Sequence, residues 1–242
     1  MPHPPTDLPL AATALFLDFD GTLAGFVEDP MAVTVAPEVC ARLSDLQTRL
    51  DGALAIVTGR SIEAIDRFLD GRVRTVAGVH GHLVRHPDGV LREASIDKAA
   101  FNQVLEALQL FALPREGVMV EVKPNAVALH YRRAPHEADH ARDAVEAAVA
   151  PHPAFHVQPG KFVFEVIGDA ENKGSAIAAL MKLPAFTGRR PVFVGDDATD
   201  EAGFVTVNEL DGLSIKVGAG DTDARYRLDG VGAVHDWLAA LA

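Results

Sequence analysis

Short apolar runs alternate with amphipathic stretches over the two ends of this chain. The runs predict buried strands over residues 15–17, 54–57, 75–79, 192–194 and 214–217. Between them, helical spacing of apolar residues predicts helices over 37–50, over 61–69 with Ser61 as the N-cap, and over 173–183. This alternation of strand and helix is typical of an α/β fold with a doubly wound parallel sheet.

The middle of the chain follows a different pattern. It predicts helices over 96–111 and 135–150, two strands within 118–131 that are interrupted at Pro124, and a further strand over 161–167. Two helices with antiparallel strands form a separate α+β unit. We therefore expect an inserted domain at 95–168 and a core made of 1–94 and 169–242. A hairpin over 83–91 is expected to lead into the insert.

Composition and charge narrow the range of partners. The 242 residues are 48% hydrophobic, enough for one large domain or two small ones. No apolar run approaches the roughly 20 residues that cross a bilayer, and the first residues lack the features of a secretory signal, so we expect a cytoplasmic protein. The net charge of −12 disfavours nucleic acid and anionic membranes as partners. A phosphate ligand would need a locally positive site, supplied by a metal ion and a lysine.

Cys40 is the single cysteine of the chain. It lies in the first helical segment among apolar residues at helical spacing, so we expect a buried structural thiol. A disulfide within the chain is excluded.

Two aspartates follow the first apolar run. Asp18 and Asp20 are expected at the carboxyl end of a buried strand, where open α/β sheets bind ligands, and alternation directs both carboxylates the same way while Phe19 points inward. Close carboxylates that converge on one point suit Mg²⁺, and Gly21 permits a tight turn after them. An Asx turn is the alternative interpretation. An EF-hand loop is disfavoured because its later ligands are missing.

Three further polar clusters follow the predicted sheet. Thr58 ends the second strand and can offer a hydroxyl to a phosphate oxygen. Lys173 begins a helix, where a cation opposes the helix dipole and calls for an anionic neighbour. Four carboxylates crowd the end of another strand and can bind metal and orient a lysine: Asp196, Asp197, Asp200 and Glu201. Taken singly, these residues could equally be a turn residue, a solvated lysine and a solvated loop.

The order of these motifs resembles the haloacid dehalogenase superfamily of phosphatases over nearly the whole chain: Asp-x-Asp-Gly-Thr, Thr-Gly-Arg, Lys, and Gly-Asp-Asp-x-x-Asp. The resemblance implies that Asp18 is the nucleophile that becomes phosphorylated and that Asp20 is the general acid and base. It implies Mg²⁺ held by Asp18, Asp196 and the backbone carbonyl of Asp20, with Thr58 and Lys173 on the phosphoryl oxygens.

The same resemblance gives Asp197 and Asp200 a supporting role. A sugar alkoxide is a poor leaving group, so a second carboxyl that delivers a proton favours hydrolysis of a phosphate ester. Asp20 therefore argues against the dehalogenase branch.

The insert occupies the place where this superfamily carries cap domains, which close over substrates and select the leaving group. The segments GVMVEVKPNAVALHYRRAP, GKFVFEVIGDAENKG and AGVHGH look like those of bacterial trehalose 6-phosphate phosphatases. The resemblance implies sugar contacts from Glu121, Lys123 and Glu165 in the cap and from the loop with His80 and Gly81. A polyhydroxylated ring does need several charged hydrogen-bond partners to replace its water.

Arg132 and Arg133 are candidates for attracting phosphate. Two departures from the family pattern stand out: Thr58 replaces a common Ser and keeps the hydroxyl, whereas residues 167–168 are Ile-Gly where many relatives have a basic residue and Pro. The second departure removes a basic contact that the family pattern would supply.

We therefore expect a Mg²⁺-dependent phosphatase that converts trehalose 6-phosphate to trehalose and phosphate, with a pathway link to the synthase that makes this sugar phosphate. A phosphatase for another sugar phosphate is the nearest alternative. A non-catalytic sugar-phosphate-binding subunit is the alternative from a different class. Two other motifs give weaker support for a function. Residues 217–224 contain Gly-x-Gly but lack the third glycine of a dinucleotide-binding fingerprint. The scattered histidines lack a complete set of ligands for a transition metal.

Overall fold

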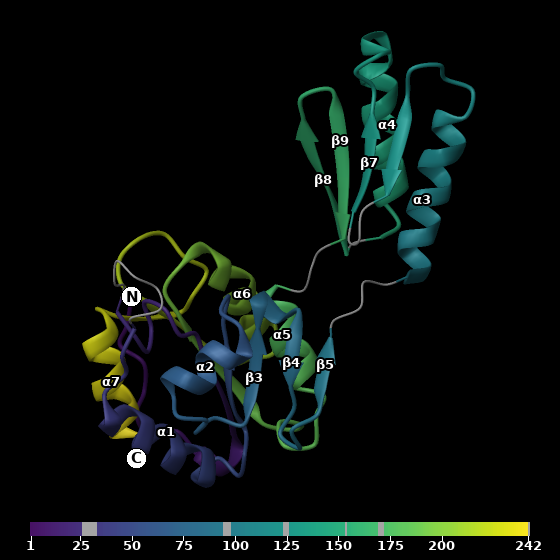
Figure 1. Cartoon of the computed structure of the whole chain (residues 1–242). Coiled ribbons are helices and arrows are strands. Elements are labelled where there is room, and N and C mark those ends of the chain that lie inside the picture. Colours follow the sequence, from purple (N-terminus) through teal and green to yellow (C-terminus); the bar gives the residue numbers. More distant parts are fainter. Residues whose placement is uncertain (26–32, 94–97, 123–125, 153, 169–171, 242) are drawn as a thin grey trace. The chain divides into compact units, whose positions relative to one another are not determined.

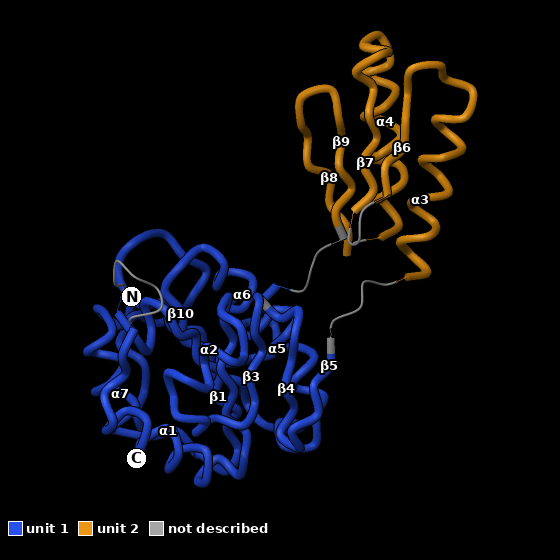
Figure 2. The backbone as a smooth tube through the Cα atoms, in the orientation of Figure 1, with its two compact units in different colours: residues 1–94, 171–242 blue, residues 95–170 orange. Residues whose placement is uncertain are grey.

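The chain folds into two compact units. A computed structural model describes residues 1–25, 33–93, 98–122, 126–152, 154–168 and 172–241. Unit 1 comprises Met1–Ala94 and Glu171–Ala242, and unit 2 comprises Ser95–Ala170 (Figure 2). The expected insert, 95–168, starts at the same residue as unit 2 and ends two residues before the end of that unit. Within the described residues, no helix combines the length and apolar character that a membrane span requires.

Unit 1 is built around an eight-stranded sheet with the order β12-β11-β10-β1-β2-β3-β4-β5. Three of these strands, β3, β4 and β5, are labelled in Figure 1. Neighbouring strands of the sheet run parallel from β12 to β3, and β4 and β5 form the predicted antiparallel hairpin. This confirms the predicted fold class. The strands are β1 (Thr13–Leu17), β2 (Leu54–Val57), β3 (Thr75–Gly78), β4 (Leu83–Arg85), β5 (Leu91–Glu93), β10 (Arg190–Gly195), β11 (Leu213–Val217) and β12 (Tyr226–Leu228).

Helices connect these strands. They are α1 (Pro37–Arg49), α2 (Ile62–Phe68), α5 (Lys173–Leu180), α6 (Glu201–Glu209) and α7 (Val231–Ala240), with short 3₁₀ turns at Leu10–Ala12, Val79–Gly81 and Ala198–Asp200. The predicted N-cap of α2 is confirmed, because the Ser61 hydroxyl accepts a hydrogen bond from the Ala64 amide at 3.3 Å. Helix α5 starts with a capping box between Asn172 and Ser175.

The core of unit 1 explains the continuous apolar runs. Strand β1 is buried at every position, so both faces of the sheet are covered there, as a parallel sheet requires. Phe16 of β1 stacks on Phe186 with a centroid distance of 5.4 Å. Leu17 lies opposite Val194 on one side and Ile56 on the other. The residues that follow β1, β2 and β10 therefore emerge at one edge of the sheet.

Unit 2 is a four-stranded antiparallel sheet with the order β6-β7-β9-β8. Its elements are α3 (Lys98–Ala112), β6 (Met119–Val122), β7 (Ala126–His130), a 3₁₀ turn (Pro135–Glu137), α4 (Ala138–Val149), β8 (Phe155–Gly160) and β9 (Val163–Gly168). Both helices pack on the sheet through a separate apolar core that includes Val104, Leu108, Leu129, Val145 and Phe164. Strand β8 was not predicted, and the predicted interruption at Pro124 lies outside the described residues.

Candidate functional site

The carboxyl edge of the unit 1 sheet gathers most of the polar residues singled out in the sequence. Asp18 directly follows β1, and its amide continues the ladder by donating to the Val194 carbonyl at 2.9 Å. Thr58 directly follows β2, and Asp196 directly follows β10. This edge is where a parallel sheet places its ligands, so three separate segments contribute to one site.

Lys173 lies between two aspartates at this edge. Its ammonium nitrogen, at the start of α5, donates to Asp18 Oδ1 at 2.8 Å and to Asp200 Oδ1 at 2.7 Å. The three side chains are almost fully buried, with exposed fractions of 3%, 5% and 0% for Lys173, Asp18 and Asp200. The anionic neighbours expected for a lysine at a helix start are therefore present.

Asp200 also fixes the loop that follows β10. Its second oxygen, Oδ2, accepts hydrogen bonds from the amides of Asp196 at 2.9 Å and Asp197 at 3.0 Å. A side chain at Gly195 would collide with the Asp200 carboxylate, so the loop needs glycine there. Asp200 thus holds Lys173 with one oxygen and the Asp196 backbone with the other.

The electrostatics of the cluster call for a further positive charge. Burial and the charge of Asp200 raise the pKa of Asp18 well above its ordinary value, against the influence of Lys173. Burial and Asp200 also raise the pKa of Asp196 to about 6. Burial works against the charge of Lys173, but Asp18 and Asp200 outweigh it, so the pKa of this lysine is raised. Lys173 contacts Asp18 and Asp200, and Lys216 donates to the backbone carbonyl of Asp196, so two ammonium groups face three carboxylates, an arrangement that a further cation would stabilise.

The carboxylates fit a hard metal ion. Oxygens of Asp18, Asp196 and Asp200 lie within 4.8 Å of one another. Asp196 Oδ1 is buried and has no hydrogen-bond partner among the described residues. Both oxygens of Asp200 already accept hydrogen bonds, so Asp18 and Asp196 have the free capacity. Oxygen donors of this kind suit Mg²⁺.

Gly21 closes the turn against the same cluster. Its φ of +74° is in the left-handed region, and a side chain there would collide with the Asp196 carboxylate. The turn after Asp20 therefore depends on glycine for two reasons, backbone conformation and close approach.

Asp20 has a different partner from Asp18, and the convergence of the two carboxylates on one point stays a prediction. Its two oxygens accept hydrogen bonds from Arg60, from Nε at 2.6 Å and from Nη2 at 2.7 Å, whereas Asp18 is held by Lys173. The reason is that a guanidinium offers two parallel donors that match a carboxylate. The backbone carbonyl of Asp20 as a metal ligand stays a prediction.

Thr58 and Asp197 are tied into the surrounding loops. Thr58 is buried, and its hydroxyl accepts a hydrogen bond from the Arg60 amide at 3.2 Å. Asp197 Oδ1 accepts from the amide and the hydroxyl of Thr199 at 2.8 and 2.7 Å. Partial burial acts against the ionised form, but these hydrogen bonds keep the pKa of Asp197 below its ordinary value. Asp197 therefore caps the turn at Ala198–Asp200.

The loop of His80 and Gly81 has an unusual backbone. Val79 has a φ of +51°, which is rare for a β-branched residue, and Gly81 has a φ of +104°. The Val79 amide donates to the Arg60 carbonyl at 2.9 Å, which ties this loop to the one after β2. Such conformations persist where surrounding contacts enforce them, and they concentrate at functional sites. The side chain of His80 lies outside what the structure describes.

Two of the predicted sugar-binding residues of the insert, Glu121 and Glu165, belong to one sheet face of unit 2. Glu121 lies opposite Ala128, and Ala128 lies opposite Glu165, so the two glutamates share a row across β6, β7 and β9. Their neighbours in sequence, Val120 and Val166, alternate with them and pack in the core under the helices. The Oε2 atom of Glu121 lies 2.8 Å from the Nε2 atom of His130.

Other predicted residues of the insert are less defined. Lys123 lies outside the described residues. Arg132 and Arg133 are exposed and line a hollow of about 460 Å³ together with His130. They are not part of the row that holds Glu121 and Glu165.

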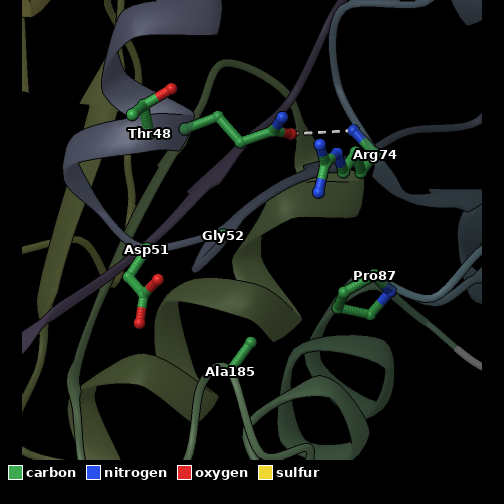
Figure 3. Close-up of a pocket in the computed structure, with 7 residues that line it drawn as sticks. Thr48, Asp51, Gly52, Arg74, Pro87 and Ala185 are labelled. Atoms are coloured by element: carbon green, nitrogen blue, oxygen red, sulfur yellow. Dashed lines mark hydrogen bonds between the residues drawn. The ribbon is translucent and has the colours of Figure 1, made fainter.

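A second hollow, of about 320 Å³, lies away from the polar cluster at the carboxyl edge of the unit 1 sheet (Figure 3). Gly52 precedes β2 and Arg74 precedes β3, so the hollow is at the amino ends of the strands. Gln47 also lines this hollow and accepts a hydrogen bond from the Arg74 amide at 2.8 Å, which is the dashed line at Arg74 in Figure 3. None of the predicted site residues lines it.

Two residues of the site were not predicted. Arg60 holds Asp20, and Lys216 of β11 is buried and donates to the Asp196 carbonyl. Arg60 stands inside the Thr-Gly-Arg motif, and Lys216 is a charged residue within an otherwise apolar strand. A lysine in a buried strand needs hydrogen-bond partners, and this requirement could have identified Lys216 as a site residue.

Comparison with known proteins agrees with this geometry. The chain is 38% identical to the trehalose-6-phosphate phosphatase of Escherichia coli K12, over 98% of this chain and 90% of that protein. The solved structure of the Aspergillus fumigatus trehalose-6-phosphate phosphatase matches with a TM-score of 0.71 and 26% identity, covering 99% and 98% of the two chains. A haloacid dehalogenase-like hydrolase from Bacillus subtilis, with a TM-score of 0.54 and 16% identity over 95% of this chain and 100% of the other, shares the fold.

A family model supports the membership of this chain in a family more strongly than any single relative does. The trehalose-phosphatase model matches residues 16–231, a span that includes every residue of the cluster at the carboxyl edge. The chain therefore belongs to the trehalose-phosphatase family.

Proposed function

We propose that this protein is a Mg²⁺-dependent phosphatase that hydrolyses trehalose 6-phosphate to trehalose and phosphate. Membership of the trehalose-phosphatase family supports hydrolysis of a phosphate monoester. The observation that carries the chemistry is the buried carboxylate of Asp18, 2.8 Å from the Lys173 ammonium at the carboxyl edge of the sheet. A carboxylate in that setting is oriented and held beside a fixed cation, as a nucleophile requires.

In the first step, an Asp18 oxygen forms a bond to phosphorus while the bond from phosphorus to the sugar oxygen breaks. Asp20 donates its proton to the departing sugar oxygen. Lys173 and Thr58 hold the phosphoryl oxygens, and the ammonium offsets the negative charge that spreads over them. The products of this step are trehalose and phosphorylated Asp18.

In the second step, Asp20 takes a proton from a water molecule whose oxygen bonds to phosphorus. The bond between phosphorus and Asp18 breaks, which restores the carboxylate and releases phosphate. The proton count closes, because Asp20 gives one proton in the first step and regains one in the second.

Asp18, Asp196 and the backbone carbonyl of Asp20 would hold the Mg²⁺. The unpartnered Asp196 Oδ1 and the mutual closeness of the carboxylates support this assignment. When bound, the ion supplies positive charge that favours the ionised carboxylates and offsets charge on the transferring phosphoryl group. Asp200 and Asp197 hold the loop that presents Asp196.

The insert acts as the cap that selects the sugar. Glu121 and Glu165 in one row of an open sheet face support this role, since a sugar ring is bound through several charged hydrogen-bond partners. Lys123, and the loop of His80 and Gly81 in unit 1, are the further sugar contacts that the family resemblance implies.

The test is release of phosphate from trehalose 6-phosphate, glucose 6-phosphate and sucrose 6-phosphate, each with Mg²⁺ and with a chelator. We expect release that depends on Mg²⁺ and is fastest for trehalose 6-phosphate. Equal turnover of the three esters would replace this proposal with a general sugar phosphatase. Binding of the ester without any release of phosphate would point to a non-catalytic subunit. The link to a trehalose 6-phosphate synthase and the cytoplasmic location stay predictions from the sequence.

A further inference from the structure

The ion pair between Arg60 and Asp20 has no role in the reaction as described so far. Arg60 Nε donates to Asp20 Oδ2 at 2.6 Å and Nη2 donates to Oδ1 at 2.7 Å. The two side chains are 16% and 29% exposed, so the pair is largely shielded from water. A pair with two parallel hydrogen bonds fixes the plane of the carboxylate as well as its position.

Arg60 is itself held from several directions. Its guanidinium lies over the ring of Phe68, 5.0 Å from the centroid, and 5.7 Å from that of Phe19. The two rings stack on each other at 5.6 Å. Phe19 follows Asp18 and precedes Asp20, so the residue between the two aspartates forms part of the platform for Arg60. The planar guanidinium suits this combination of stacking and bidentate pairing, which lysine does not reproduce.

The backbone of Arg60 is also tied to neighbouring parts of the site. Its amide donates to Thr58 Oγ1 at 3.2 Å, and its carbonyl accepts from the Val79 amide at 2.9 Å. A side chain at Gly78 would come within 2.8 Å of that carbonyl, so the loop after β3 approaches closely. One residue therefore links the phosphate-binding hydroxyl, the acid–base carboxylate and the loop of His80 and Gly81.

We propose that Arg60 is a positioning residue that holds the Asp20 carboxylate in the orientation needed for proton transfer. This inference rests on the proposed role of Asp20 as general acid and base. Each Asp20 oxygen keeps a second lone pair after it accepts from Arg60. An oxygen held in this way can still take the proton of the attacking water while the oxygen of that water bonds to phosphorus and the bond from phosphorus to Asp18 breaks. Arg60 keeps its own protons throughout.

A matched control pair exists in the same unit. Arg85 of β4 donates to Asp66 of α2 through Nη1 at 2.6 Å and Nη2 at 2.7 Å, and these side chains are 20% and 36% exposed. The hydrogen-bond lengths and the exposure resemble those of Arg60 and Asp20. Neither Arg85 nor Asp66 belongs to the site at the carboxyl edge. Substitution of Arg85 therefore reports what the loss of such a pair does to the fold, together with the loss of the hydrogen bonds from Arg85 to the carbonyls of Val73 and Arg74.

The experiment uses p-nitrophenyl phosphate with the wild type, Arg60→Met and Arg85→Met. Nitrophenolate leaves without a proton from Asp20, so the first step proceeds and the second step is isolated. Rapid-mixing kinetics record the burst of nitrophenolate, and acid quenching records phosphate bound to the protein. For Arg60→Met we expect steady-state turnover to fall about tenfold or more relative to Arg85→Met, within the range that a general base contributes. We also expect a burst and phosphoprotein close to one per folded molecule.

Two further variants separate positioning from structural damage. Arg60→Lys keeps the positive charge but loses the paired donors, and we expect its turnover to lie between those of the wild type and Arg60→Met. In an Asp20→Asn background, Arg60→Met should cause less than about a twofold further loss, since the two residues act as a unit. Melting curves give the folded fraction for each variant.

The result that overturns the inference is Arg60→Met with the same turnover as Arg85→Met and no accumulated phosphoprotein. A fall in turnover without phosphoprotein, or a full additional loss in the Asp20→Asn background, would also overturn it, because Arg60 would then act elsewhere. If the wild type releases phosphate from neither the aryl ester nor the sugar ester, the proposed function fails and this inference fails with it. An active wild type with normal Arg60→Met kinetics defeats the inference alone.

Discussion

Charged residues are used in opposite ways in the two units. At the carboxyl edge of the unit 1 sheet, Asp18, Lys173 and Asp200 are buried and hold one another by hydrogen bonds of 2.7–2.8 Å. On the sheet face of unit 2, the Glu121 side chain is half exposed, and its partner, His130, comes from the neighbouring strand. The first arrangement is fixed before any ligand binds, whereas the second offers hydrogen-bonding groups to solvent.

Under the proposed function, this difference separates the residues that act on the phosphoryl group from those that select the leaving group. A preorganised, buried cluster acts on the phosphoryl group of any ester, because its geometry does not depend on the leaving group. An exposed row of carboxylates can only act by contacting the part of the ligand that differs between esters. Substitutions in unit 1 should therefore slow all substrates, and substitutions on the unit 2 face should slow the sugar ester alone.

The largest effect is expected from Asp18→Asn. Asparagine keeps the shape of the side chain but cannot form the phosphorylated intermediate, and Lys173 keeps Asp200 as its partner. We expect turnover of trehalose 6-phosphate and of p-nitrophenyl phosphate to fall by roughly 10⁴-fold or more. Steady-state phosphate release measures this, with circular dichroism as the check on folding. Near-normal turnover of either ester would contradict covalent catalysis by Asp18.

Lys173→Met should weaken both catalysis and folding. The substitution leaves the buried carboxylates of Asp18 and Asp200 without their shared cation, which costs about 3–5 kcal/mol in the free energy of unfolding. Urea denaturation without added metal measures this loss. Lys182→Met is the control, since Lys182 is exposed and follows the same helix. Equal stability of the two variants would show that the buried lysine does not hold the cluster together.

Substitutions of the predicted sugar-binding residues in unit 2 should discriminate between substrates. We expect Glu121→Gln and Lys123→Ala to lower kcat/KM for trehalose 6-phosphate by about 10–100-fold, since each removes a charged hydrogen bond to the sugar. The same variants should hydrolyse p-nitrophenyl phosphate at close to the wild-type rate. Glu146→Gln, on an exposed position of α4, serves as the control. Equal losses on both esters would contradict the proposal that unit 2 selects the sugar and unit 1 carries out the chemistry.

The smallest expected effect is the pH dependence of Mg²⁺ binding. The pKa of Asp196 is raised to about 6 by burial and by Asp200, so below pH 6 this carboxyl carries a proton that Mg²⁺ must displace. Affinity should therefore fall as the pH drops below 6, by about tenfold per pH unit for the proton on Asp196, and the raised pKa of Asp18 adds a loss in the same direction. Calorimetric titration with Mg²⁺ between pH 5 and 8 measures this. A flat profile would exclude Asp196 as a ligand.

The raised pKa of Asp196 also makes the stability of the metal-free protein depend on pH. The folded state binds more protons at Asp196 than the unfolded state does between the ordinary pKa of 3.8 and about 6. The free energy of unfolding contributed by this group is therefore highest at low pH and falls as pH rises through that window. Saturating Mg²⁺ should remove this loss, and melting temperatures with and without the ion would record the change.

Much of the fold followed from local pattern. Strands β1, β2 and β10 lie under helices on both faces, and this leaves continuous apolar runs that are easy to recognise. The position of Asp18 at the end of β1 then predicts which edge carries the site. Strand β8 escaped prediction because Phe155–Gly160 contains Pro and Gly, which are tolerated there since β8 lies at the edge of its sheet.

Contacts between side chains were harder to predict. Lys173 could be given an anionic neighbour because its place at a helix start is unfavourable alone. The pairing of Asp20 with Arg60 depends on the rotamers of both side chains and on the path of the loop after β2, which no periodicity encodes. Helix α5 also ends at Leu180 rather than at 183, ahead of the turn that leads to Pro184.

The most direct test of the central claim is to locate the phosphate on the protein. The Asp20→Asn variant, mixed with p-nitrophenyl phosphate and Mg²⁺, should complete the first step and stall before the second. Acid quenching, reduction with borohydride and peptide mass spectrometry would then identify the modified residue. The account predicts a phosphorylated carboxylate at Asp18, in an amount close to one per molecule. Steady release of nitrophenolate with no modified residue, or with the modification at another position, would contradict it.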